Sequence, residues 1–465
     1  VAQTDMVTGL TTSYTWDGAS QRLASVTDPG LATVSYHYSA GKLVKVTRPV
    51  PASAGGGTAQ LAAIVADQPL DAVPGLDLTQ FDAYGLPRRA TKVFAVFGPD
   101  QVIDGAPTAQ AWQRADVWLT DDVGYTIHEG SFGGGAWQLT ANVYDESDNV
   151  THSWDARATA AIRSGAITDI NAAATTTMFN QTDITGADGT VLVPARTRVE
   201  HVYTPAAMIR TKGSDVAEML RKHVATTYDE GAPTPGLSLP TKIQVTAERP
   251  DGTVVETLST TFTGYNKLEA SDSKSGWDLR TATSVTLDMN SNGVPDSADI
   301  RRETRYDAQG RVIEQRQPGA ASTDPGTRRT VYWTAGTNPA DSSCGGQPAW
   351  AGYGCSEGPA SQPAGTPLPV TYHRDYQWHG ATATEQDISG AVTRTTTTTF
   401  DAKTRPVTVS TTVTGLPGST PIPAVTTTYD DTTGLITGTQ STAGSTAMTH
   451  DSWGRQLTYT TSGSG

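Results

Sequence analysis

The chain has 465 residues with 36% hydrophobic and 17% charged residues, and a formal net charge of −14. This acidic balance, with no Lys/Arg cluster, argues against a nucleic-acid-binding surface, and no stretch reaches the roughly 20 apolar residues that span a bilayer. Abundant Thr, 46 Gly and 27 Pro favour short strands and tight turns, while 10 Trp and 16 Tyr along the chain argue against disorder.

The two ends of the chain indicate that it is part of something longer. It begins Val1-Ala2-Gln3, without an initiator Met or a signal sequence, and it ends in the Ser/Gly-rich stretch 461–465, partway through a repeat. We therefore expect an internal piece of a longer protein, whose targeting information lies elsewhere.

A short motif recurs along the chain. It consists of an aromatic residue, Asp, a turn with Gly or a basic residue, and then alternating aliphatic residues. Adjacent copies are about twenty residues apart. The copies are Trp16-Asp17 to Leu23, Tyr38 to Leu43, Phe81-Asp82 to Leu86, Tyr144-Asp145 to Val150, Tyr306-Asp307 to Val312, Phe400-Asp401 to Arg405, Tyr429-Asp430 to Leu435 and His450-Asp451 to Arg455.

Each copy is predicted to be a β-hairpin. Asp opens the turn because its carboxylate accepts backbone N–H groups, and Gly supplies the positive φ that other residues resist. One hairpin is only marginally stable in water, so hairpins must stack side by side. We expect residues 300–465 to form one continuous antiparallel sheet, with turns at Asp307–Gly310, Asp401–Arg405 and Asp451–Gly454.

The motif resembles the RHS/YD repeat (aromatic-Asp-x-x-Gly-Arg-Leu) through residues 14–47 and 300–460. The segment 328–339, with the two cysteines that follow it, is similar to RHS proteins of actinobacterial type. The resemblance implies an all-β fold of stacked hairpins, a long spiralling sheet that forms a hollow shell with a few short helices. Repeats would occupy residues 1–50 and 301–465, and residues 51–300 would be a less regular part of the same shell.

Two short helices are predicted within the less regular region. Asp155 could cap a helix over Ala156–Arg163, where Ala predominates. Ser214-Asp215 could cap a second helix. The apolar face of that second helix would carry Val216, Met219, Leu220 and Val224.

The segment Asp288–Asp299 has the spacing of an EF-hand-type calcium loop. Oxygen-bearing side chains fall at positions 1, 3, 5, 9 and 12, Gly293 is at position 6, and Val294 offers its carbonyl at position 7. Hard oxygen ligands favour Ca²⁺ over transition metals. The predicted ligands are Asp288, Asn290, Asn292, Val294, Asp296 and Asp299. The alternative is a polar turn in which Asn and Asp only cap the backbone.

The two cysteines, Cys344 and Cys355, lie close together in a Gly-rich loop. An even count at short spacing in a Thr-rich, acidic chain favours a disulfide and an oxidising compartment, with two unpaired buried thiols as the alternative. A zinc site would need two further ligands, and this loop has no other Cys or His.

The sequence contains no Gly-x-Ser-x-Gly elbow, His-Glu-x-x-His helix or phosphate-binding loop, and we expect no enzyme activity. His373, Asp375, Gln377 and His379 could share one strand face, but a solvated sheet explains them better than a catalytic or metal site.

RHS-type repeats are known to enclose a C-terminal toxin in bacterial competition, and similar repeats form adhesion scaffolds in teneurins. The resemblance therefore implies a bacterial, secreted or cell-surface shell segment whose partners are the rest of its own chain and an enclosed effector. The alternative is an adhesin or glycan-binding scaffold with Trp333, Trp350 and Trp378 as stacking platforms.

Overall fold

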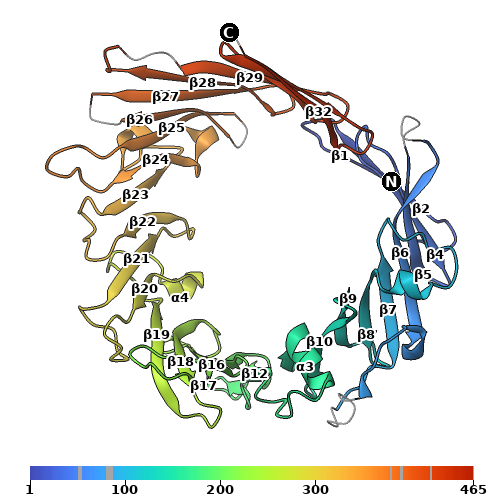
Figure 1. Cartoon of the computed structure of the whole chain (residues 1–465). Helices are drawn as coiled ribbons and strands as arrows, with labels where there is room; N and C mark the ends of the chain where they lie inside the picture. The colour runs from blue at the N-terminus through green and yellow to red at the C-terminus, as the bar shows by residue number, and fades with distance from the viewer. Residues whose placement is uncertain (51–54, 80–86, 378–379, 388–390, 419–421, 464–465) are drawn as a thin grey trace.

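A computed structural model describes residues 1–50, 55–79, 87–377, 380–387, 391–418 and 422–463. Within these described ranges, thirty strands form one sheet, and a separate pair of short strands makes a second. The long sheet bends through most of a circle, so that its N-terminal and C-terminal parts approach each other (Figure 1). The predicted all-β architecture with few short helices is confirmed.

The strands of the first third are β1 to β11. They are Ala2–Thr4, Thr11–Trp16, Leu23–Thr27, Val34–Ser39, Lys42–Pro49, Thr58–Pro69, Lys92–Phe97, Ala115–Thr120, Thr126–Gly133, Ala136–Tyr144 and Val150–Trp154. Strands β12 to β20 are Thr175–Phe179, Ile184–Thr185, Val191–Val193, Val199–Tyr203, Ala207–Ile209, Glu218–Tyr228, Pro240–Glu248, Val254–Gly264 and Ser284–Leu287.

The C-terminal part is built from β21 to β32. They are Ile300–Tyr306, Val312–Arg316, Thr327–Tyr332, Gly354–Pro359, Val370–Gln377, Gly380–Asp387, Thr393–Phe400, Pro406–Thr414, Ile422–Tyr429, Ile436–Ser441, Gly444–His450 and Gln456–Gly463. The α-helices are α2 (Ala109–Trp112), α3 (Ala156–Arg163) and α4 (Gly276–Leu279), and 3₁₀ turns cover Leu70–Ala72, Ser342–Cys344 and Pro348–Trp350.

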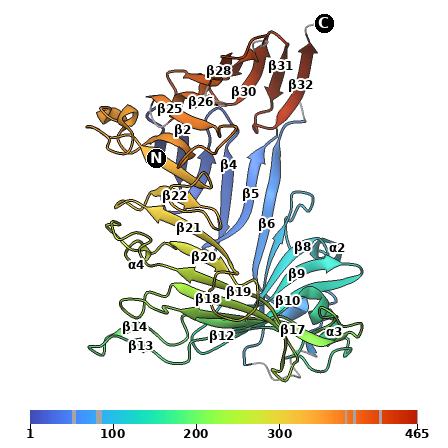
Figure 2. The same ribbon diagram turned by 90° about the vertical axis from the view of Figure 1, so that its left-hand side faces the viewer.

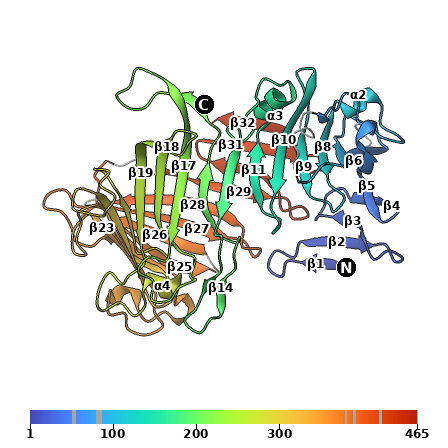
Figure 3. The same ribbon diagram turned by 90° about the horizontal axis from the view of Figure 1, so that it is seen from below.

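Strand pairing follows the chain almost everywhere. Each strand from β1 to β12 pairs antiparallel with the next, as do the strands from β17 to β32. Between these two runs, β12 pairs with β15 and β15 with β17, while β13 and β14 form their own hairpin. Figures 2 and 3 show the same ribbon from the side and from below, with neighbouring strands lying side by side across the curved sheet. We call this curved sheet the wall. Residues 300–465 thus form one continuous antiparallel array wherever they are described, as predicted.

The repeat turns have the predicted Asp geometry. The Asp307 carboxylate accepts the N–H groups of Gln309 and Arg311 at 2.9 and 3.0 Å, and Gly310 has φ +81°. The equivalent bonds are present in the turns that begin at Asp401 and Asp451. The repeat copy over residues 81–86 lies outside the described residues.

In the repeats that carry Arg311 and Arg405, the Arg links one hairpin to the next. The Arg311 guanidinium bonds Asp307 at 2.7 Å and lies 4.3 Å from the ring centroid of Tyr332, on the strand after the next turn. Arg405 makes the same two contacts with its turn Asp and with Tyr429, at 2.7 and 4.6 Å. A cation over an aromatic face adds roughly 0.5–1 kcal/mol at an exposed site. These contacts therefore hold successive repeats in register in addition to the strand ladder.

The largest apolar core lies in the N-terminal half of the wall. Phe97, Trp112, Trp137 and Leu139 are buried together on β7, α2 and β10. The C-terminal strands are instead rich in Thr, and facing hydroxyls bond across the strands, as between Thr439 and Thr446 at 2.8 Å. One wall is thus stabilised in two ways, by a packed core and by cross-strand polar pairs.

The helix predicted over Ala156–Arg163 is confirmed as α3, and the Asp155 side chain accepts the Ala158 N–H at 2.7 Å. The helix predicted after Ser214-Asp215 is wrong, because residues 218–228 form strand β17.

Strand pairing explains this error. Of the apolar residues assigned to that helix face, Leu220 is fully buried, whereas Val216 is 73% and Met219 46% exposed. Val224 pairs with Val202 on one side and Val245 on the other. Two neighbouring strands thus use the alternating pattern of this segment and override its helix-like spacing.

The lowered pKa values of the turn carboxylates predict that the repeat turns lose stability in acid. Backbone N–H groups of Thr433 and Thr432 lower the pKa of Asp430. Burial raises the pKa of Asp401, but hydrogen bonds from the Arg405 backbone and guanidinium outweigh it, so that pKa is also lowered. A pKa lowered by folding stabilises the protein above the unfolded value of about 3.9 and loses that contribution as pH falls through the folded value.

We expect protection of the repeat turns against hydrogen exchange, after correction for intrinsic rates, to be constant above about pH 5 and to fall below about pH 4. Asp401→Asn should flatten this dependence in its own turn only. The same acid profile in the variant and the wild-type turn would contradict the assignment.

Candidate functional site

The segment Asp288–Asp299 connects β20 to β21, whose last and first residues, Leu287 and Ile300, face each other in the ladder. The predicted ligand side chains converge on one another. Asn290 and Asn292 both donate their amide N–H groups to Asp296 Oδ2, at 3.0 and 2.6 Å. Asp299 accepts the backbone N–H groups of Met289 and Asp296, each at 2.9 Å.

Asp288 differs from the other loop carboxylates in its burial. It is only 6% exposed, and its Oδ2 accepts the Gly293 N–H at 2.9 Å across the loop. Its Oδ1 is buried and has no hydrogen-bond partner. Gly293 has φ +79°, the left-handed conformation that its position in the turn requires. A buried carboxylate oxygen without a partner is costly, because nothing replaces its lost hydration.

Among the residues that the structure describes, no three or more His, Cys, Asp or Glu side chains gather as a group that could hold a metal by themselves. The ligand set predicted for residues 288–299 contains three carboxylates, those of Asp288, Asp296 and Asp299, which are not gathered as such a group, together with two amides and the Val294 carbonyl.

The structure joins Cys344 to Cys355, the pair named from the sequence. Both residues are fully buried against Trp333, and the half-buried Trp350 contacts Trp333 edge to face at 5.0 Å. The Trp333 indole donates to the His373 carbonyl at 3.1 Å. The disulfide therefore lies inside a small aromatic cluster that pins the loop to the sheet.

The stacking platform expected for an adhesin is wrong for Trp333, which is only 4% exposed. Its ring packs against the disulfide and Trp350 rather than facing solvent. Trp378 lies outside the described residues. In the polar strand His373–His379, position 379 and the side chains of Asp375 and Gln377 also lie outside them.

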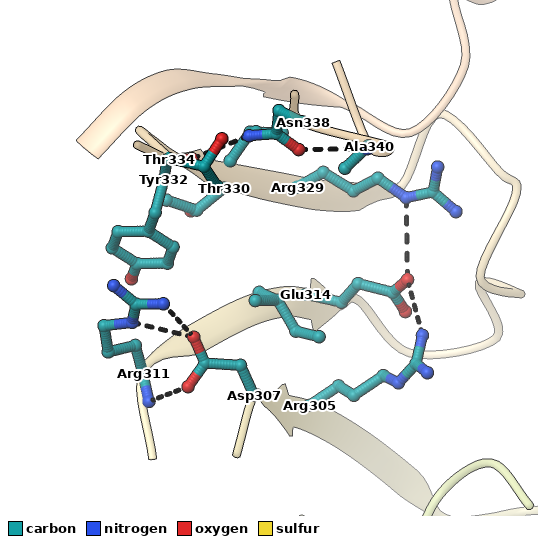
Figure 4. A pocket seen from close by; sticks show the side chains of 12 residues that line it. Arg305, Asp307, Arg311, Glu314, Arg329, Thr330, Tyr332, Thr334, Asn338 and Ala340 are labelled. Atoms are coloured by element: carbon teal, nitrogen blue, oxygen red, sulfur yellow. Dashed lines mark hydrogen bonds and ion pairs between the residues drawn. The ribbon is translucent and has the colours of Figure 1, made fainter. Parts of the chain in front are cut away.

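A pocket of about 430 Å³ opens over β21, β22 and β23 (Figure 4). Glu314 lies at its centre, and its carboxylate pairs with Arg305 at 3.3 Å and with Arg329 at 3.5 Å. A third guanidinium, that of Arg316, bonds Glu314 at 3.0 Å. This network could not be predicted from the sequence, because its members come from several strands and no local motif marks them.

The two ends of the chain meet through turns rather than through strand pairing. The Trp453 indole donates to the Pro49 carbonyl at 3.0 Å, and Arg48 lies 3.6 Å from the Trp453 ring centroid. The Ala32 N–H donates to the Ser452 carbonyl at 2.7 Å. We call this contact, between residues 30–32 and 48–49 on one side and 432–433 and 451–455 on the other, the seam.

The seam leaves little free space. A Cβ on Gly30 would lie 2.6 Å from the Thr433 methyl group, and Gly30 also has φ +66°. Both the close approach and the backbone conformation thus favour glycine at this position. The seam brings into contact residues that are about four hundred positions apart in the sequence.

No protein-family model matches the chain, and no curated protein matches it. Solved structures that are similar to it include TcdB2-TccC3, at 10% identity over 99% of this chain with a TM-score of 0.28. Another is a mutant form of the Photorhabdus luminescens Tc holotoxin pore, at 12% identity over 98% of this chain with a TM-score of 0.26. The chain spans 27% and 25% of those two chains. TM-scores this low support no conclusion about this chain, and its fold is described from its own array of hairpins.

In the described part of the chain, no helix has both the length and the apolar character needed to cross a bilayer.

Proposed function

We propose that this chain is part of the wall of a hollow, secreted shell of the RHS/YD-repeat type, which encloses or displays an effector carried by the same longer protein. The observation that carries the proposal is the closure of the sheet. A single array of hairpins curves round until its first and last repeats touch at the seam (Figure 1).

The array has the properties that a wall needs. Consecutive strands are hydrogen-bonded along its length, and Arg–Tyr contacts tie the turns at Arg311 and Arg405 to the strands that follow. Helices α3 and α4 lie on the concave side of the ring, where an enclosed polypeptide would contact them (Figure 1). The role proposed is mechanical enclosure, with no catalytic step assigned to the wall.

A secreted location is part of the proposal. The disulfide between Cys344 and Cys355 supports it, because such bonds persist in oxidising compartments. The partners proposed are the remainder of the same protein and its effector. These follow from the resemblance of the repeats to RHS proteins.

The test is protease protection in the natural protein at its full length. If the wall encloses an effector, that segment should resist a protease that cleaves the same segment produced alone. Trp453→Ala should expose it, because the variant loses the indole hydrogen bond and the stacked guanidinium at the seam, together on the order of 2 kcal/mol. Cleavage of the effector segment at equal rates in both contexts would refute the enclosure.

A matched variant controls for general loss of stability. Trp118 is half-buried on β8, where its ring contacts Phe94 at 5.8 Å, in the wall away from the seam. Trp118→Ala should leave the protection of the effector segment unchanged. In the chain alone, small-angle scattering should show an increased radius of gyration for Trp453→Ala and none for Trp118→Ala. If neither variant expands the particle, the seam does not close the ring.

A further inference from the structure

One oxygen of the Asp288 carboxylate lacks a hydrogen-bond partner in the structure. One oxygen accepts the Gly293 N–H, so the side chain points across the loop, but the other oxygen is buried without a partner. Elsewhere along the chain, turn carboxylates such as Asp307 have both oxygens bonded. A buried anionic oxygen of this kind is stabilised by a cation or by an ordered donor.

A second buried oxygen lies at the same point of the sheet. The Asp288 N–H donates to the Thr260 carbonyl at 3.0 Å, which makes the two residues cross-strand neighbours. Thr260 is 1% exposed, and its hydroxyl oxygen also has no partner. Cross-strand neighbours project on the same face of a sheet, so two buried polar groups next to the loop have no partner in the structure.

The remaining loop oxygens are gathered on the solvent side. Asp296 is the acceptor for both Asn290 and Asn292, and Asp299 reaches back to the Met289 and Asp296 N–H groups. No Lys or Arg side chain is among the hydrogen-bond partners found for this loop in the described structure. Its negative charge is therefore held by amide groups alone.

We infer that Asp288–Asp299 binds one Ca²⁺ ion, with Asp288, Asn290, Asn292, the Val294 carbonyl, Asp296 and Asp299 as its ligands. The Asn290 and Asn292 amides then turn their oxygens to the ion instead of donating to Asp296, and the ion meets the unpaired Asp288 oxygen. An all-oxygen set suits Ca²⁺, whereas Mg²⁺ demands stricter octahedral geometry. The site braces the β20–β21 connection, so its role is structural, and the inference is independent of what the shell encloses.

Calorimetric titration of the folded chain with CaCl₂ tests the inference. We expect one site with a Kd of roughly 10⁻⁴–10⁻³ M, as in extracellular modules. Asp288→Asn should weaken binding at least tenfold, because it removes the buried charge. Asp251→Asn is the matched control in the turn between β18 and β19, where the carboxylate only caps the Thr253 N–H, and it should bind like the wild type.

Asn292→Asp provides a gain that misfolding cannot mimic. It adds a carboxylate at an exposed position of the loop and should tighten Ca²⁺ binding several-fold, since affinity in such loops rises with ligand charge. Absence of binding by the wild type at 10 mM, equal affinity of wild type and Asp288→Asn, no gain in Asn292→Asp, or Mg²⁺ binding as tight as Ca²⁺ would each overturn the site. None of these results bears on protease protection by the shell.

Discussion

Replacing Glu314 with glutamine is expected to destabilise the wall around β21–β23 by about 3 kcal/mol, the order found when one partner of a buried ion pair is removed. Glu314 is 4% exposed and carries the only carboxylate that bonds Arg305, Arg316 and Arg329 together in the described structure. Glutamine keeps the shape but removes the charge, so the three guanidinium groups repel one another. The loss is measured as the change in the free energy of unfolding in urea, with hydrogen exchange of β21–β23 as the local readout.

The matched control is Glu357→Gln on the neighbouring strand β24. Glu357 bonds Arg328 at 2.6 Å, but both side chains are substantially exposed, and the pair should contribute less than about 1 kcal/mol. Arg305 and Arg316 keep their bonds to Asp272 and Glu269 in the Glu314 variant, which limits its effect. Equal losses in the two variants would show that burial of Glu314 does not matter.

Replacing both Cys344 and Cys355 with serine is expected to cost about 3 kcal/mol in the loop that they close. The two residues are 11 positions apart, and the cross-link restricts the unfolded loop in the chain-entropy model. The buried hydroxyls would also lie beside Trp333, in a cluster with little polar surface. Because unfolding of a repeat array is not two-state, the loss should be measured locally, by hydrogen exchange of residues 327–359.

Thiol titration distinguishes the disulfide from the alternative of two buried thiols. The unreduced, denatured protein should contain no reactive sulfhydryl, and reduction should release two. Detection of two thiols before reduction would contradict the disulfide. It would also contradict the support that the disulfide gives to an oxidising compartment.

The parts that the sequence predicts correctly are those encoded locally. At Asp307–Gly310 the Asp and the Gly three residues later define the turn together, because both residues act within one turn of backbone. The cap at Asp155 is local in the same sense. The approach of Asn290 and Asn292 to Asp296 is local as well, and the calcium ligand set assigned to this loop stays a prediction.

Interactions between residues far apart in the sequence were not predicted. The Glu314 network joins residues from several strands, and the seam joins Pro49 to Trp453. Such contacts depend on how far the sheet curves, which no single repeat specifies. The wrong helix after Ser214 has the same origin, since pairing of β17 with β15 and β18 is invisible in the local pattern. Similarly, the copies that begin at Tyr306 and Phe400 show an Arg at the end of the turn, but not that its guanidinium lies over the Tyr of the following strand.

The seam changes how the array loses its structure. In an open row of hairpins, each unit contacts only its neighbours, so unfolding starts with fraying at either end and travels inward. Here the first and last repeats hold each other through Trp453, Arg48 and Ala32. Strands β1 to β3 and β32 lie outside the seam residues and can fray first, but further opening must break this contact, after which both sides of the seam lose their protection together. Between the seam residues the row has no free end, so it opens at one point rather than from two sides.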